Sequence, residues 1–155
     1  MQKYIGTKQI EARPMTRGDY NIYRGWQIPA DENPADEGYL VRHSDVYESW
    51  SPKAQFEEAY RPCNNLTFGI AIEMIKRGFK VARKGWNGKK QYIQLATAIS
   101  YKSMDGDVVN CEHESIGNKA IAFVGTSGVQ MGWLASQADM LAEDWVIVEY
   151  KQNNC

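Results

Sequence analysis

The hydrophobic and polar positions along the chain predict many short strands and few helices. Short runs rich in β-branched and aromatic residues, bounded by Gly, Pro, Asn or Asp, are typical of strands. A polar stretch with Pro29 and Pro34 separates the first such run from the next, and residues 105–118 are expected to form a loop. The predicted strands cover residues 4–12, 38–41, 46–50, 80–84, 91–95, 119–124, 129–134 and 145–148. The fifth and sixth of these are far apart in the chain, whereas the sixth and seventh form a hairpin around residues 126–128.

Two helices are predicted from their N-terminal signals. Ser51 is expected to be the N-cap of a helix that has Pro52 at its first position and runs to about residue 60. Ser136 is expected to cap a short helix over residues 137–142, with Asp139 at the capping-box position.

A third helix is predicted between Thr67, a good N-cap, and Gly78, which suits a helix C-terminus. Ile70 and Met74 fall on a different face from its main apolar stripe, which indicates a helix packed on two sides and hints at oligomerisation. The residues of the stripe are Phe68, Ala71, Ile72 and Ile75. Near the C-terminus, the residues expected in the core are Leu134, Ala138, Leu141 and Trp145.

These elements predict an α+β fold, a small and mostly antiparallel sheet with short helices packed on it. A Pro/Asn cluster at residues 61–65 favours a boundary there. We therefore expect two domains, residues 1–62, a small β-meander with a helix, and residues 63–155, the main domain. Because about 60 residues are marginal for independent stability, the first is expected to pack on the second or on a neighbouring chain.

Composition places the chain among folded soluble proteins. Its 155 residues are 43% hydrophobic and 24% charged, which argues against intrinsic disorder. With 18 basic and 19 acidic residues, a globally basic nucleic-acid binder is disfavoured. No apolar run approaches the roughly 20 residues that span a bilayer, and the N-terminus lacks the pattern of a signal peptide. Three widely spaced cysteines predict reduced thiols in a cytosolic protein.

A basic window is the strongest local feature. Residues 76–90 hold seven Lys or Arg side chains and no acid, with Trp86 and Asn87 among them. Cations around a flat aromatic ring suit a ligand with phosphates and a base, because the charges meet the phosphates and the indole stacks on the base. The alternative is a solvated strand edge protected by lysines. We also expect Trp86, on a predicted turn, to lie outside the core.

A second feature is the helix start at Ser136 and Gln137, where free N–H groups could meet an anion. Trp133 stands just before it. Function and a purely structural role are equally supported for Trp133 and Gln137, since tryptophans near a helix start are often part of the core.

Catalytic arrangements are hard to find. The chain has two His residues, His43 and His113, one in each half, and no nucleophile elbow, P-loop or dinucleotide fingerprint. We expect no metal, no cofactor and no catalytic residue. Glu143 and Asp144 are the candidates for a general base if the protein is an enzyme after all.

Three segments carry a resemblance to a known family. Residues 68–78, residues 81–88 (Val-Ala-Arg-Lys-Gly-Trp-Asn-Gly) and residues 133–145 (Trp-Leu-Ala-Ser-Gln-Ala-Asp-Met-Leu-Ala-Glu-Asp-Trp) resemble the phage Thoeris anti-defence sponge family, second type. The resemblance covers roughly residues 66–149.

The resemblance implies a protein that sequesters cyclic ADP-ribose isomers without cleaving them, in the cytoplasm of the infected bacterial host. It further implies cyclic dinucleotides or trinucleotides of CBASS as possible second ligands, and a homotetramer with pockets between subunits; neither a membrane nor nucleic acid is implied. The residues carried over by position are Phe68, Arg83, Lys84, Trp86, Asn87, Trp133, Ala135, Ser136, Gln137 and Asp144.

Chemistry suggests roles for most of these residues. Trp86 or Trp133 would stack on adenine, and Arg83 and Lys84 would neutralise the diphosphate. Asn87, Ser136 and Gln137, as polar groups of the same motifs, would bond ribose hydroxyls or base edges.

Residues 1–65 depart from minimal family members, and parts of them resemble a short module attached to many phage proteins. Two alternative functions remain open: an enzyme that degrades the signal, and a nucleic-acid or protein-binding module.

Overall fold

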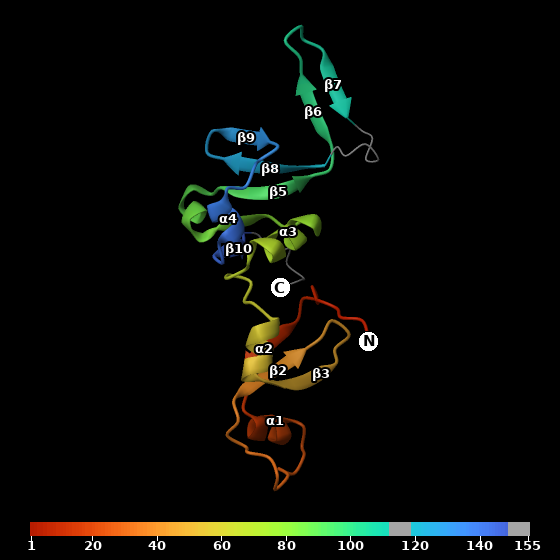
Figure 1. Cartoon of the computed structure of the whole chain (residues 1–155), viewed down its shortest axis with the longest axis vertical. Helices are drawn as coiled ribbons and strands as arrows, with labels where there is room; N and C mark the ends of the chain where they lie inside the picture. Colours follow the sequence, from red (N-terminus) through yellow and green to blue (C-terminus); the bar gives the residue numbers. More distant parts are fainter. Residues whose placement is uncertain (112–118, 149–155) are drawn as a thin grey trace. The chain divides into compact units, whose positions relative to one another are not determined.

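The computed structural model describes residues 1–111 and 119–148 (Figure 1). By contacts the described residues separate into two compact units, residues 1–61 and the described residues from Pro62 to 148. Antiparallel sheets and short helices make up the described residues, so the predicted α+β class is confirmed.

The first unit is a three-stranded sheet with two short helices. The sheet has the order β1-β2-β3, and both pairs of neighbours are antiparallel. Tyr39 of β2 stacks on Phe56 of α2 with ring centroids 4.0 Å apart, so aromatic packing attaches that helix to the sheet. The elements are β1 (Glu11–Pro14), α1 (Arg17–Tyr23), β2 (Gly38–Arg42), β3 (Glu48–Pro52) and α2 (Lys53–Ala59).

Three predictions for this unit were wrong. The strand predicted at residues 4–12 begins only at Glu11, because strand pairing with β2 starts there. Helix α1 lies in the stretch predicted to be a polar loop; the Thr16 hydroxyl accepts from the Asp19 N–H at its start. Ser51 is not an N-cap but a β3 residue opposite Tyr39, because the strand continues to Pro52, which itself occupies the cap position.

The second unit contains a five-stranded antiparallel sheet in the order β10-β4-β5-β8-β9 and a separate hairpin, β6-β7 (Figure 1). The chain's last described strand therefore lies beside the first strand of the unit. The elements are α3 (Phe68–Lys76), β4 (Val81–Arg83), the 3-10 helix η1 (Lys84–Lys89), β5 (Tyr92–Ala96), β6 (Ile99–Lys102), β7 (Val108–Cys111), β8 (Ala120–Gly125), β9 (Gly128–Met131), α4 (Gln137–Leu141) and β10 (Trp145–Ile147).

Helix α3 packs against the sheet and forms the core of the unit. Its predicted N-cap is confirmed, since the Thr67 hydroxyl accepts from the Ile70 N–H at 3.4 Å. Met74 was expected on a separate, second face, but it is buried in the same core as Ala71 and Ile75, because residues three and four positions after Ala71 lie on the same side of the helix. The buried core residues are Leu66, Ala71, Met74, Ile75, Phe79, Val81, Ile93, Trp145 and Ile147.

Two predictions for this unit need correction. Leu134, Ala138 and Leu141 are exposed, with Leu134 at 89% and Leu141 at 81%. The five-residue α4 is too short to present a core face, and of the predicted C-terminal core group Trp145 alone is buried. The segment expected to be a loop contains strand β7, which pairs with β6; residues 112–118 lie outside the described residues.

Gly38 is expected to be important for the stability of the first unit. A Cβ at this position would overlap the Ser51 carbonyl oxygen and the Trp50 indole, so Gly38→Ala should lower the free energy of unfolding by about 1–3 kcal/mol. Urea unfolding followed by tryptophan fluorescence measures this. The control is Gly69→Ala on α3, where a Cβ meets nothing within 4 Å; equal stability of the two variants would contradict the prediction.

Candidate functional site

An aromatic cluster lies where the two sequence motifs meet. Trp145 of β10 is fully buried at its centre. The ring of Trp86 lies 5.4 Å from Trp145, 5.8 Å from Trp133 and 5.4 Å from Phe123, each in an edge-to-face arrangement. Phe68 lies 5.5 Å from Trp145. Such pairs each contribute about 0.5–1.5 kcal/mol beyond the burial of area, so the cluster holds η1, β10 and the segment after β9 together.

Trp86 is therefore not outside the core, as its turn position suggested. It is half-buried and packs against the core, and so is Trp133. Gly132 precedes Trp133 with a φ of +74°, a conformation that suits glycine. Both residues thus stay partly exposed, while three neighbouring rings fix the orientation of Trp86 and two fix that of Trp133.

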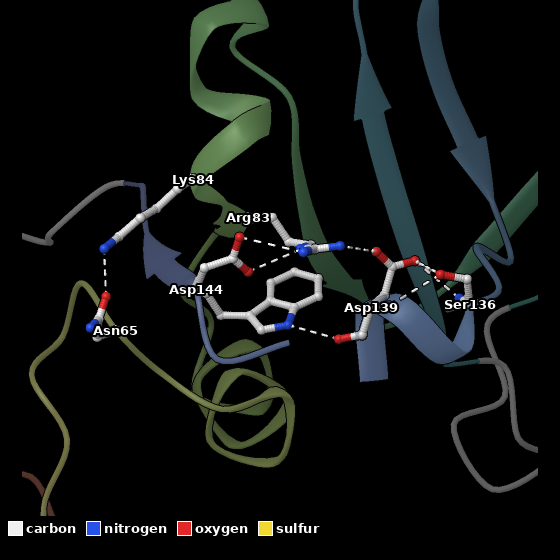
Figure 2. A network of polar contacts seen from close by, with 7 residues as sticks. Asn65, Arg83, Lys84, Ser136, Asp139 and Asp144 are labelled. Atoms are coloured by element: carbon white, nitrogen blue, oxygen red, sulfur yellow. Dashed lines mark hydrogen bonds and ion pairs between the residues drawn. The ribbon is translucent and has the colours of Figure 1, made fainter. Parts of the chain in front are cut away.

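A salt-bridge clamp lies beside the cluster (Figure 2). The Arg83 guanidinium donates from Nε to Asp144 Oδ1 at 3.0 Å, from Nη2 to Asp144 Oδ2 at 3.4 Å, and from Nη1 to Asp139 Oδ1 at 3.1 Å. The hydrogen bond to Asp144 is the main cause that raises the pKa of Arg83. One cation therefore joins β4, α4 and the residue before β10.

Asp139 is the second centre of this network. Its carboxylate accepts from the Ser136 N–H at 3.0 Å and from the Ser136 hydroxyl at 2.7 Å, while the Ser136 hydroxyl accepts from the Asp139 N–H at 3.1 Å. The predicted capping box is confirmed. The Asp139 carbonyl oxygen also accepts from Trp145 Nε1 at 3.0 Å (Figure 2). Burial raises the pKa of Asp139, but the hydrogen bonds from Ser136 and Arg83 outweigh it and leave the pKa lowered.

These contacts change the interpretation of the α4 start. Free N–H groups at Ser136 and Gln137 were expected to be available for an anion, but the Ser136 N–H donates to the Asp139 carboxylate within the capping box. The Asp139 carboxylate stands at the same place, and its charge would repel an anion.

The basic window does not protect a strand edge, because β4 lies between β10 and β5 inside the sheet. Its charges differ in how they are compensated. Lys76 pairs with Glu73 at 2.9 Å, and Arg83 is held by two carboxylates. Lys84 instead donates to the neutral amide oxygen of Asn65 at 2.5 Å (Figure 2). Lys84 is exposed, and among the described residues its amine has no carboxylate partner.

The structure thus brings most of the predicted site residues into two adjoining groups. Phe68, Trp86 and Trp133 meet in the aromatic cluster, and Arg83, Asp144 and Ser136 meet in the clamp. Ala135 is half-buried and Gln137 is exposed, whereas the side chain of Asn87 lies outside the described residues.

Sequence reasoning missed three contributors: Asp139 as an ionic partner, Phe123 and Asn65. The Asp139–Arg83 pair joins residues 56 positions apart, and no local sequence signal marks such a contact.

Within residues 1–111 and 119–148, no group of three or more His, Cys, Asp or Glu side chains could hold a metal ion. No helix in the same ranges combines the length and the apolar character that crossing a membrane requires.

Comparison with known proteins gives two matches. Residues 66–148 match the family described as the Thoeris anti-defense 2-like domain. The chain is also similar to Thoeris anti-defense 2 of Bacillus phage SP01, with 39% identity over 88 residues, which cover 54% of this chain and 94% of that relative. The matched segment includes all ten residues carried over as ligand-binding.

Asp139→Asn should reduce the loss of stability that the protein undergoes as the pH falls into the acid range. The folded-state pKa of Asp139 lies below its ordinary value of 3.8, so its ionised form stabilises the fold above about pH 3.8, and this contribution is lost as the pH falls through the lower folded value. The variant should lose about 1.5–3 kcal/mol at pH 7 and less at lower pH. Urea titrations between pH 2.5 and 7 measure this. Asp31→Asn, at an exposed loop position, is the control, and a variant profile parallel to that of the wild type would refute the role.

Trp86→Ala should destabilise the second unit as well as any ligand complex. The ring contacts three aromatic neighbours, and its removal should cost up to about 3 kcal/mol. Thermal unfolding by circular dichroism tests this, with Tyr101→Ala in the exposed β6-β7 hairpin as the control. An unchanged melting temperature for Trp86→Ala would show that the ring does not support the fold.

Proposed function

The chain belongs to the Thoeris anti-defense 2-like family, and from this premise we propose that it captures a cyclic nucleotide immune signal without cleaving it. Membership makes anti-defence its role. The proposed ligands are cyclic ADP-ribose isomers and, in a second site, cyclic dinucleotides or trinucleotides. The proposed place of action is the cytoplasm of the infected bacterial host.

One observation carries the proposal: two half-buried tryptophans are in ring contact, and one of them, Trp86, shares the 3-10 helix η1 with Lys84. Among the described residues, the Lys84 amine meets a neutral amide and no carboxylate. A base stacks on an indole, at about 1–3 kcal/mol, and an ammonium binds a phosphate by a charge-assisted hydrogen bond. Trp133 contacts two rings of the cluster whereas Trp86 contacts three. We therefore assign the stacking role to Trp133 and a bracing role to Trp86.

The clamp suggests different roles for the two basic residues Arg83 and Lys84. Arg83 meets two carboxylates, so this group carries net negative charge and is a poor phosphate site. We assign phosphate binding to Lys84 and a positioning role to Arg83, which fixes Asp144 and Asp139. A carboxylate held at both oxygens still has lone pairs for ribose hydroxyl donors. Gln137, which is exposed, and Asn87 are assigned as further polar groups.

The lowered pKa of Asp139 supports capture of the ligand without cleavage. A general acid or base works best with a pKa near the working pH, and the pKa of Asp139 is shifted in the opposite direction. The alternative, an enzyme that degrades the signal, would depend on Glu143 or Asp144.

We also propose a homotetramer with ligand pockets between subunits. Residues 1–62 are proposed to be a separate small module attached to a sponge domain of residues 63–155.

Calorimetric titration with cyclic ADP-ribose isomers, cyclic dinucleotides and cyclic trinucleotides tests the proposal. Saturation at a fixed stoichiometry is expected, and chromatography after heat denaturation should return the ligand intact. A converted product would instead establish an enzyme. A steep loss of affinity with salt for long polyanions would favour a nucleic-acid binder.

Lys84→Gln should weaken binding of the captured ligand by at least tenfold, since a charge-assisted hydrogen bond contributes about 1.5–3 kcal/mol. Lys76→Gln is the matched control from the same basic window, because the Lys76 amine already pairs with Glu73. The two variants should be equally stable. Equal affinities for the two would remove Lys84 from the site.

A further inference from the structure

The two edges of the five-stranded sheet differ in whether another segment of the chain covers them. At one edge, residues 63–66 cover β10: the N–H and C=O of Trp145 both bond to Leu66, at 3.2 and 2.8 Å, and the Ile147 N–H donates to the Cys63 carbonyl. At the other edge lies β9, whose strand partner in the sheet is β8 (Figure 1).

The register shows which backbone groups of β9 point outward. The Trp133 N–H donates to the Ile121 carbonyl at 2.9 Å, so the backbone of Ile121 faces β9. In an antiparallel ladder the backbone N–H and C=O groups of successive residues point alternately toward and away from the neighbouring strand. The backbone groups of Phe123 therefore also point toward β9, and those of its partner Gln130 point toward β8. The N–H and C=O groups of Val129 and Met131 consequently point away from β8.

No partner for these groups is found in the described part of the chain. The backbone hydrogen bonds outside the regular ladders include none from Val129 or Met131. Both side chains are exposed, Val129 at 62% and Met131 at 39%. Four hydrogen-bonding groups thus form a row along an apolar edge.

The edge also lacks the charges and prolines that often prevent pairing. Proteins protect exposed edges with short strands, charges, prolines, bulges or covering segments. Strand β1 of the first unit follows this rule, with Glu11, Arg13 and Pro14. Strand β9 reads Gly-Val-Gln-Met and has neither a charge nor a proline.

We propose that β9 pairs antiparallel with β9 of a second copy of this chain, on a two-fold axis through Gln130, to give one continuous sheet. A neutral strand meets its own copy without like-charge repulsion, whereas it offers no counter-charge to a charged peptide. The inference does not depend on which ligand the chain binds.

One register satisfies every outward group. With Gln130 opposite Gln130, Val129 of each copy faces Met131 of the other as a hydrogen-bonded pair, and all the N–H and C=O groups of these residues find partners. With Val129 opposite Val129, Met131 would instead lie opposite the Ser127 turn position. The first register also places Trp133 of one copy opposite Ser127 of the other, so the second copy would border the aromatic cluster.

The mass of the full chain in solution tests the pairing. Sedimentation should give at least two chains for the wild type and fewer for Val129→Lys, because a buried ammonium at the joint is unfavourable. Val108→Lys, at a 66% exposed strand position of the β6-β7 hairpin, should keep the wild-type mass. A monomeric wild type, or equal masses for the two variants, would overturn the proposal.

A cross-link tests the register without relying on a destabilising charge. The Gln130 pair would be non-hydrogen-bonded, with Cα atoms about 4.5 Å apart, within disulfide range. With Cys63, Cys111 and Cys155 replaced by Ser, Gln130→Cys should give a covalent dimer on oxidation, and Thr126→Cys should not. Circular dichroism confirms that each variant is folded. Absence of the Gln130→Cys dimer would overturn the pairing.

Discussion

The candidate site depends on the clamp in which one guanidinium binds two carboxylates from different elements. Arg83 ends β4, Asp139 lies in α4 and Asp144 precedes β10. Pairing of β10 with β4 places Trp145 directly opposite Arg83, and the Trp145 indole donates to the Asp139 carbonyl. Ion pair, strand pairing and aromatic packing thus support one another, and the two sequence motifs cannot separate without breaking all three.

This arrangement also decides the electrostatics of the site. In sequence the basic window is a run of equivalent cations, yet Arg83 is neutralised by carboxylates and Lys76 by Glu73. Lys84 instead meets a neutral amide and, among the described residues, no carboxylate. In the proposed complex a phosphate would be attracted by Lys84 rather than by the residue with the most donors, because two nearby carboxylates cancel the field of the guanidinium.

The two edges of the five-stranded sheet connect the candidate site to the proposed assembly. Residues 63–66 cover β10, which carries the centre of the aromatic cluster, and leave no backbone group of Trp145 for another chain. Strand β9 leads directly into Trp133 and is uncharged along its length. The covered edge at β10 therefore holds the buried centre of the aromatic cluster in place, while the edge at β9 is suited to pairing with a second copy.

The sequence by itself determined what depends on neighbours along the chain: the Thr67 and Ser136 helix caps, the β8-β9 hairpin and the α+β class. Local hydrogen bonds and side-chain alternation encode these features directly. The tertiary structure alone decided that Met74 is core, that Trp86 is half-buried and that Arg83 faces Asp139. Each of these involves residues distant in sequence, and a local pattern records which side chains are available but not which strand or helix will lie against them.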